Sequence, residues 1–287
     1  MCYSHQYIIR QKNLKTDLDK LKQYLLSNKL SIPNIENLRV KEFDFQFEEK
    51  KKVFKEVKEF IERHEWLGKM SLYPTHIFTA RYKGILSGVV VMDMPTAFSK
   101  LLGDDTKKIE RLISRGACVS WSPKNLASSL ISYSINWMVK HTQYRLFTAY
   151  SDPEANELGT IYQACNFYYL GQKSGTKYKY KYQEKVVSDR YFRSRSFYKR
   201  IAKELNIKWQ NNWQLGDRVL FYNMPVEIEK EIKQKSKDYQ NNADRIKVTP
   251  KHKYCYIKGR NKNETKLLIK KFKEKNKVLK YPKNRGV

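Results

Sequence analysis

The fold is decided by the segment from Ile113 to Gly171, which closes with the stretch Gly159-Thr160-Ile161-Tyr162-Gln163-Ala164-Cys165-Asn166-Phe167. Its apolar spacing predicts a strand, a loop that opens a helix, the helix itself, a strand, a short helix and a closing strand. Ser122-Pro123 is a helix-start signal, and the helix it opens is expected to run to about Lys140. Asn166 is expected to supply the left-handed C-terminal cap that glycine usually provides.

Upstream of this segment, two apolar runs joined by Lys83-Gly84 predict a β-hairpin. The upstream chain is also expected to hold helices at Leu14–Ser27 and Glu49–Trp66 and a strand at Leu38–Phe47. Downstream of Gly171 the composition shifts to Lys and Tyr, and the expected elements are helices at Arg190–Leu205 and Val226–Asp238, a strand at His252–Ile257 and a Lys-rich segment at Lys266–Lys280.

The fold class expected from this order is α/β (α+β), with a mixed central sheet flanked by helices and a basic helical C-terminal extension. The expected domains are an N-terminal helix and strand in residues 1–50, a core in residues 51–186 and the extension in residues 187–287. The extension contains the strand at His252–Ile257, which is expected to rejoin the core sheet.

The formal net charge of +29 favours a polyanionic partner, because 58 Lys and Arg face only 29 Asp and Glu. An AT-rich genome would also enrich Lys, but it would not explain the shortage of acids. No apolar stretch is long enough to span a membrane, and the N-terminus has no signal-peptide pattern. Cys2, Cys118, Cys165 and Cys255 are scattered, which argues against disulfides and a zinc site and for a cytoplasmic protein.

Two residues of the quoted segment suit proton-transfer chemistry. Asp152 follows a predicted strand directly and precedes Pro153, so it lies at a strand's carboxyl end, where open α/β sheets bind ligands. Tyr162 begins the next helix on the same edge. Asp152 is the candidate base or metal ligand, and Tyr162 is the candidate acid or ligand. The alternative is structural: Asp152 forms a turn, and Tyr162 is a core residue whose hydroxyl is hydrogen-bonded.

The order of elements, with a tyrosine in a short helix before the closing strand, resembles the acyl-binding half of the GNAT acetyltransferase superfamily. A narrower resemblance rests on motifs that occur in a fixed order. These are Leu86-Ser87-Gly88-Val89-Val90-Val91-Met92-Asp93-Met94-Pro95, Leu112-Ile113-Ser114-Arg115, Ser122-Pro123-Lys124-Asn125, Ser151-Asp152-Pro153 and Gly159-Thr160-Ile161-Tyr162-Gln163-Ala164. Together they resemble the bacteriophage Mom family of DNA-modification proteins, a divergent GNAT-like group, and the resemblance is best from about His64 to Gly171.

The Mom resemblance implies an enzyme that converts adenine in phage DNA to N6-carbamoylmethyladenine (acetamidoadenine) and so blocks host restriction enzymes. It implies functional roles for Arg115, Asp152 and Tyr162. It also implies a role for His64, because the family is thought to use iron, and His64 with Asp152 would then be a minimal metal pair. A histidine that follows an amphipathic helix is otherwise a structural residue. The cellular setting would be the cytoplasm of an infected or lysogenic bacterium.

The GNAT resemblance implies a donor whose phosphates lie at the helix that opens near Ser122. The residues expected there are Ser122, Lys124, Asn125 and Ser128. The family pattern places glycine-like positions in this loop, whereas the stretch Ser122–Ser128 has no glycine. The donor therefore stays open, with an acetyl-CoA-like molecule as one option.

An enzyme that acts on adenine N6 needs double-stranded DNA with the base flipped out, or a single strand. An aromatic wall for such a base is expected from Trp66, Tyr73, Trp121 and Tyr150. Arg193, Arg195, Lys199 and Arg200 on the predicted basic helix, together with the Lys266–Lys280 segment, are expected to bind phosphates. Alternatively, they form solvated helical faces. The oligomeric state stays open, a homodimer being one option.

Two other functions are compatible with the sequence. One is an ordinary GNAT N-acetyltransferase that uses acetyl-CoA on a protein, a tRNA or a small amine, and the glycine-free loop argues against it. The other is a non-catalytic nucleic-acid-binding protein on a transferase scaffold, in which Arg115, Asp152 and Tyr162 could be changed without loss of function.

Overall fold

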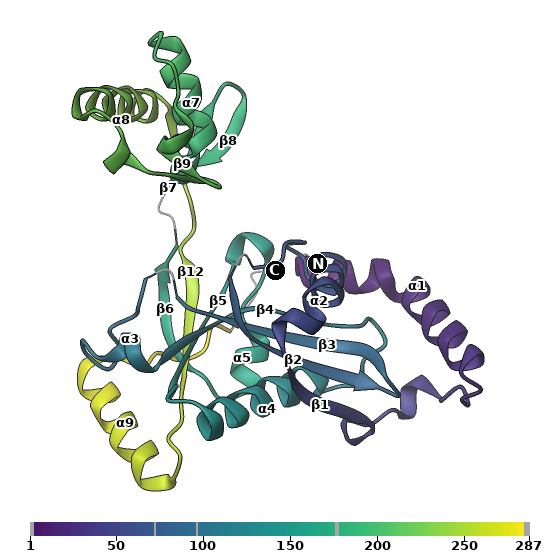
Figure 1. The fold of residues 1–287 in the computed structure, drawn as a ribbon. Helices are drawn as coiled ribbons and strands as arrows, with labels where there is room; N and C mark the ends of the chain where they lie inside the picture. The colour runs from purple at the N-terminus through teal and green to yellow at the C-terminus, as the bar shows by residue number, and fades with distance from the viewer. Residues whose placement is uncertain (1–2, 72, 96, 176–177, 284–287) are drawn as a thin grey trace. The chain divides into compact units, whose positions relative to one another are not determined.

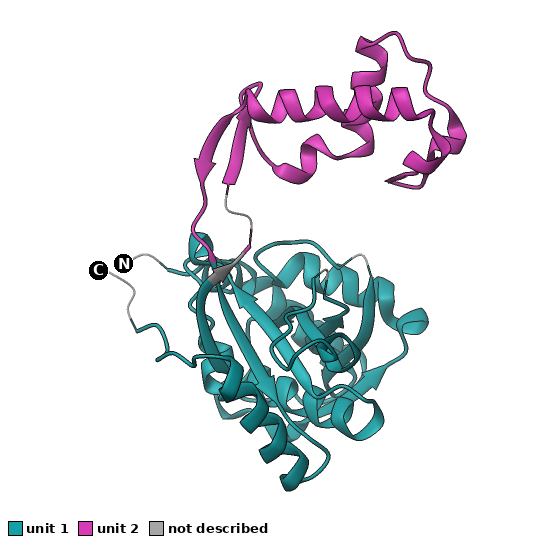
Figure 2. Cartoon of the chain, turned by 90° about the vertical axis from the view of Figure 1, so that its left-hand side faces the viewer, with its two compact units in different colours: residues 1–174, 251–287 teal, residues 175–250 magenta. Residues whose placement is uncertain are grey.

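The computed structural model describes residues 3–71, 73–95, 97–175 and 178–283, and it divides into two compact units (Figure 2). Unit 1 comprises residues 1–174 and 251–287, and unit 2 comprises residues 175–250. This division differs from the expected domains of residues 1–50, 51–186 and 187–287. The reason is backbone pairing, since strands from both ends of the chain hydrogen-bond within one sheet.

Unit 1 is built on a seven-stranded sheet in the order β1-β2-β3-β4-β5-β12-β6 (Figure 1). Neighbouring strands are antiparallel except for β4 and β5, which are parallel. The mixed α/β class predicted from the sequence is therefore confirmed. The strands are β1 Phe43–Glu48, β2 Pro74–Tyr82, β3 Ile85–Asp93, β4 Glu110–Cys118, β5 Leu146–Ser151, β6 Tyr168–Ser174 and β12 Lys251–Ile257.

The pairing of β4 with β5 is short. Only residues 110–112 of β4 pair with residues 146–148 of β5. Beyond that point β4 continues to pair with β3 as far as Cys118, while β5 continues to pair with β12 as far as Ser151. We call this region the β4–β5 fork, meaning residues 113–118 of β4 and 149–151 of β5. The two strands of the fork face each other without backbone hydrogen bonds between them.

Helices cover both faces of this sheet, with α4 on one face and α1 and α2 on the other (Figure 1). The buried residues of α2 follow the helical period at Val53, Val57, Phe60, Ile61 and His64, so a single stripe faces the core. The helices of unit 1 are α1 His5–Ser27, α2 Lys50–His64, α3 Thr106–Ile109, α4 Leu126–His141, α5 Thr160–Ala164 and α9 Lys262–Lys275, with short 3₁₀ turns at Ile35–Asn37, Val40–Glu42 and Pro153–Ala155.

Unit 2 has a small sheet in the order β11-β7-β8 and an aromatic core of its own. The core gathers Phe192, Phe197, Ile201 and Ile232, all nearly inaccessible to solvent. Its elements are β7 Tyr178–Tyr182, β8 Lys185–Ser188, α6 Asp189–Phe192, α7 Arg195–Glu204, a hairpin of β9 Gln214–Leu215 and β10 Arg218–Val219, α8 Val226–Asn241 and β11 Asp244–Lys247, with 3₁₀ turns at Asn211–Trp213 and Phe221–Asn223.

Elements with strong local signals lie close to where the sequence predicts them. The hairpin is β2–β3, and Asn166 adopts the expected left-handed conformation, with φ of 58°. Two predictions about helices are wrong. The expected helix Arg190–Leu205 is broken into α6 and α7, because the Ser194 side chain caps α7 by accepting a hydrogen bond from Phe197 N. Ser122 does not open α4 either, since Asn125 precedes the helix in the left-handed region.

Within the described residues, no helix is both long and apolar enough to cross a membrane.

Gly159 has a backbone and a packing reason to be glycine. Its φ is +68°, and a Cβ there would lie 2.5 Å from Tyr254 Cε2 and 2.9 Å from Ser151 Oγ. We expect Gly159→Ala to lower the free energy of unfolding of the full chain by about 2–3 kcal/mol, measured by urea titration. Gly68→Ala is the matched control, since Gly68 also has a positive φ of +59° but its nearest neighbour would be 3.6 Å away. Equal effects of the two changes would contradict the packing argument.

Candidate active site

Four segments of the chain meet around the β4–β5 fork (Figure 1). They are the end of α2, the loop that leads from β4 into α4, the turn after β5, and α5. Contacts fix this arrangement: Gly159 packs against Ser151 at the end of β5, and Cys165 Sγ lies 3.6 Å from Ser128 O in the first turn of α4. The short helix α5 therefore lies between the chain that follows β4 and the chain that follows β5.

Tyr162 is held in α5 by aromatic packing. Its ring centroid lies 5.5 Å from that of Tyr254 and 5.4 Å from that of Phe167, and the residue is half-buried. Burial, together with the nearby carboxylates of Glu65 and Glu157, raises the pKa of the phenol well above its usual range. The hydroxyl therefore stays protonated at neutral pH, as a proton donor must.

Arg115 projects from β4 within the fork and is paired with Glu65, the residue that follows α2. Arg115 Nε lies 3.5 Å from Glu65 Oε2 and also donates a hydrogen bond to Lys69 O at 2.6 Å. Burial raises the pKa of Glu65 to about 7, although the charge of Arg115 lowers it. The sequence identified Arg115 but not Glu65, and the fold brings both toward Tyr162.

Asp152 has a different environment from Glu65, because both of its oxygens are engaged. Oδ1 accepts a hydrogen bond from Glu154 N at 3.1 Å, which caps the 3₁₀ turn after β5. Oδ2 lies 2.9 Å from Lys251 Nζ at the start of β12. Asp152 thus fixes the end of β5, and the carboxylates that act on the Tyr162 phenol are those of Glu65 and Glu157.

His64 is buried and anchored at both ring nitrogens. Nδ1 lies 3.0 Å from Phe60 O, and Nε2 lies 3.1 Å from Asp17 Oδ2. Within the described ranges, no group of three or more His, Cys, Asp or Glu is arranged to hold a metal ion. The arrangement around His64 therefore does not fit the iron site expected from His64 and Asp152.

Asp17 on α1 is the hydrogen-bonding centre beneath the site. Its carboxylate binds His64, accepts hydrogen bonds from Ser120 N and Oγ at 3.1 and 2.7 Å, and pairs with Arg63 at 2.8 Å. Burial would raise the pKa of Asp17, but the hydrogen bonds of His64 and Ser120 outweigh it and hold the pKa well below its usual range. The sequence contained a signal, since Asp17 lies one turn before Leu21 on the buried stripe of α1.

The residues expected to bind donor phosphates divide into two pairs. Ser122 is buried, and Arg10 on α1 donates to its carbonyl at 2.9 Å; Ser128 Oγ donates to Asn125 O at 3.0 Å. Lys124 and Asn125 are exposed at the start of α4, a 16-residue helix. Asn125 makes no side-chain capping hydrogen bond among the described residues. The first turn of α4 with Lys124 suits a phosphate group.

The expected aromatic wall is partly wrong. Trp121 is only 4% exposed and packs in the core against Phe43 and Tyr82, so it cannot face a substrate base. Trp66 and Tyr150 are half-buried, and Tyr73 is 80% exposed.

The basic residues expected on DNA belong to unit 2 and are engaged within it. Arg193 pairs with Asp189, Arg195 Nη2 lies 2.9 Å from Asp217 Oδ1, and Lys199 Nζ lies 5.8 Å from the ring centroid of Trp209. The Arg200 guanidinium lies 4.4 Å from the ring centroid of Phe197, within the aromatic core of that unit. These contacts lie within unit 2, and binding of DNA by the four side chains stays a prediction.

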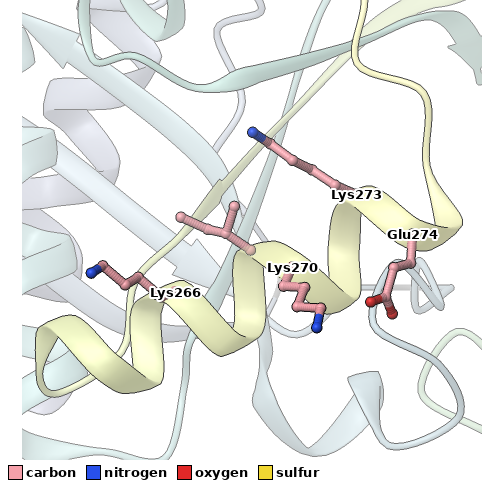
Figure 3. A pocket seen from close by; sticks show the side chains of 5 residues that line it. Lys266, Lys270, Lys273 and Glu274 are labelled. Carbon is pink, nitrogen blue, oxygen red and sulfur yellow. The ribbon is translucent and has the colours of Figure 1, made fainter.

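In unit 1, α9 carries a stripe of lysines. Figure 3 shows Lys266, Lys270 and Lys273 around a surface hollow that Ile269 and Glu274 also line. α9 is anchored to the core by Phe272, which is fully buried, with its ring centroid 5.2 Å from that of Tyr168.

A family model described as "Mom protein family" matches residues 44–283. The sequence matches no curated protein. Among solved structures, the chain is similar to a GNAT family acetyltransferase from Elizabethkingia anophelis with acetyl-CoA bound (10% identity, 76% of this chain and 99% of that chain, TM-score 0.38).

Two further structures are similar. One is an acetyl transferase from Salmonella typhimurium that modifies the N-terminal serine of ribosomal protein L7/L12 (11% identity, 85% and 90% coverage, TM-score 0.31). The other is an N-acetyltransferase from Staphylococcus aureus (21% identity, TM-score 0.28), where the match covers 33% of this chain and about half, 54%, of that chain. These likenesses are too distant to inform on activity.

We expect Asp17→Asn to lower the free energy of unfolding at pH 7 by about 3 kcal/mol, since it removes the charge that His64, Arg63 and Ser120 share. The pKa of Asp17 is lower in the folded than in the unfolded chain. Its contribution is therefore complete above the unfolded pKa of about 4 and is lost as pH falls toward the folded pKa. In denaturant titrations between pH 2.5 and 7, the free energy of unfolding of this variant should fall less steeply with decreasing pH than that of the wild type. Asp19→Asn, at an exposed position of the same helix, is the control and should match the wild type.

Proposed function

The chain belongs to the Mom protein family, and from this premise we propose that it is a transferase that attaches a carbamoylmethyl group to adenine N6 in DNA and so protects the DNA from restriction. The observation that carries the proposal is the grouping at the β4–β5 fork. A phenol that stays protonated, Tyr162, lies on α5, and a guanidinium and carboxyl pair, Arg115 and Glu65, lies between β4 and the end of α2.

This grouping suits transfer to a weak nucleophile. The exocyclic amine of adenine needs a positioned acceptor for its proton and a stabilised charge in the transition state. In the proposed reaction adenine N6 bonds to the carbamoylmethyl carbon as the bond from that carbon to the leaving group breaks. The Glu65 carboxylate, paired with Arg115, accepts the N6 proton, and Tyr162 protonates the leaving group. Asp152, paired with Lys251, keeps the end of β5 and the turn toward α5 in place.

The proposed DNA contacts are electrostatic. Lys266, Lys270 and Lys273 form the stripe on α9, and lysine ammonium groups bind backbone phosphates without reading sequence. The chain's excess of 29 positive charges supports a polyanionic substrate. The basic residues of α6 and α7 contribute less in this proposal, because their charges are already paired or packed on rings.

The donor site proposed here is the first turn of α4 with Lys124. Uncapped backbone N–H groups at the start of a long helix favour phosphate, so a phosphate-containing donor such as acetyl-CoA is the specific alternative that this feature supports. In that case the protein would be an N-acetyltransferase, and the acceptor amine would not need to be in DNA.

To test the proposal, the full chain is expressed in a bacterium and host DNA is digested to nucleosides for mass spectrometry. We expect an adenosine species of carbamoylmethyl mass. Tyr162→Phe should reduce it about 100-fold or more, since it removes the proton donor. Tyr73→Phe, at a residue that is 80% exposed, should leave its yield unchanged. Asp152→Ala should reduce the yield through displacement of the turn after β5.

Unmodified host DNA from a soluble, folded protein would contradict the proposed function. Acetyl-CoA binding by the same preparation, lost in Lys124→Glu, would then support the acetyltransferase alternative.

A further inference from the structure

Glu65 is held by its neighbours on both sides of the backbone. Its N–H donates to Ile61 O at 3.0 Å, and its carbonyl accepts from Gly68 N at 2.9 Å. The next residue, Trp66, donates its N–H to Gln6 Oε1 on α1 at 3.1 Å. A side chain on so fixed a backbone has a defined position, as recognition of a ligand requires.

The carboxyl group of Glu65 is incompletely satisfied. Oε2 is shielded from solvent and has no hydrogen-bond donor among the described residues, and the side chain is only 12% exposed. Arg115 lies 3.5 Å away, but its Nε is directed to Lys69 O and its Nη1 donates to Ser114 O. A buried acceptor without a donor is costly, so such an atom in a native protein calls for a partner.

We propose that Glu65 and Arg115 recognise the nucleobase that is to be modified. The carboxylate accepts a hydrogen bond from an exocyclic amino group of the base, and the guanidinium donates one to the adjacent ring nitrogen. We call these two residues the reading pair. This proposal rests on the proposed function and deepens it by naming the residues that choose the base. Arg115 has five N–H donors, and the two hydrogen bonds described above leave others for a ligand.

The chemistry of the bases fits such a pair. Adenine and cytosine present an amino donor beside a ring-nitrogen acceptor, which matches a carboxylate beside a guanidinium. Guanine, thymine and hypoxanthine present a carbonyl oxygen where adenine has its amine, and that oxygen would face the Glu65 carboxylate. A ligand that leaves the buried polar groups of a site without partners is rejected strongly. An apolar site discriminates much less between ligands that differ only in size.

The reading pair also lies where the reaction is proposed. Glu65 is close enough to Tyr162 for its carboxylate to raise the pKa of the phenol. In this proposal an amine bound by Glu65 lies in the same part of the fork as the residue that protonates the leaving group. Asp152 is less suited to this role, because one of its oxygens caps the turn after β5 through Glu154 N and the other is paired with Lys251.

The test compares binding of the full-length protein to three labelled single-stranded oligodeoxynucleotides by fluorescence anisotropy at pH 8. Their bases are adenine, purine (adenine without its amino group) and hypoxanthine, so the phosphate contacts are equal. We expect the wild type to bind the adenine oligomer about ten to a hundred times more tightly than the other two, as one charge-assisted hydrogen bond predicts.

Two substitutions separate recognition from other roles. Glu65→Met removes the acceptor and should bring the three affinities together, with binding of the purine oligomer unchanged. Glu65→Gln keeps an acceptor oxygen and adds an N–H donor, so it should retain adenine binding and gain hypoxanthine binding about tenfold. Glu62→Met, at an exposed position of α2 that pairs with Lys58 at 3.8 Å, is the control and should behave as the wild type. If Glu65→Met does not fold, the gain of hypoxanthine binding in Glu65→Gln decides.

A wild type that binds all three oligomers equally, or a Glu65→Met that keeps the adenine preference, would overturn the reading pair. These outcomes are separate from failure of the proposed function. Modified adenosine in cells without an adenine preference refutes the pair alone. An adenine preference lost in Glu65→Met, without modified adenosine, supports the pair and refutes the proposed function.

Discussion

The early end of the β4–β5 pairing is the constraint on which the candidate site depends. Each strand keeps its other neighbour, β3 or β12, beyond the point where the two separate. The facing edges of the fork therefore carry backbone groups that a strand would otherwise satisfy, and such groups need partners. The end of α2, the loop into α4 and the helix α5 gather around these edges, which brings Glu65, Arg115 and Tyr162 together from distant parts of the sequence.

The N-terminal helix gives the site its rigidity, although it lies before the residues that the family model matches, 44–283. Three of its side chains reach site segments. Gln6 contacts the backbone after α2, Arg10 holds the loop before α4, and Asp17 joins His64 to Ser120. His64 is thus explained by packing and hydrogen bonding. The residues proposed to take part in the reaction lie within residues 44–283, but α1, which holds their segments in place, lies outside this range.

The sequence predicted those parts of the fold that local signals determine. The hairpin β2–β3, the helix α4, the strand β5 and the left-handed Asn166 follow from periodicity and turn residues. Long-range contacts could not be predicted in this way: α4 begins after Asn125, and Ser122 instead accepts a hydrogen bond at its carbonyl from Arg10, more than a hundred residues earlier. Glu65 was missed for the same reason. Its environment comes from Arg115 on β4 and from burial, and neither is visible in the local pattern around α2.

The position of β12 has a consequence for biosynthesis. β12 is the last strand of the sheet to be translated, but it lies between β5 and β6, both of which precede it by more than 75 residues. Until residue 257 has left the ribosome, those two strands lack their common neighbour and expose open edges that invite wrong pairing. Residues 175–250 are contiguous and have their own core, so they can fold before the sheet of unit 1 is complete. The nascent chain is therefore most vulnerable to misassembly after its inserted unit has formed and before its final strand arrives.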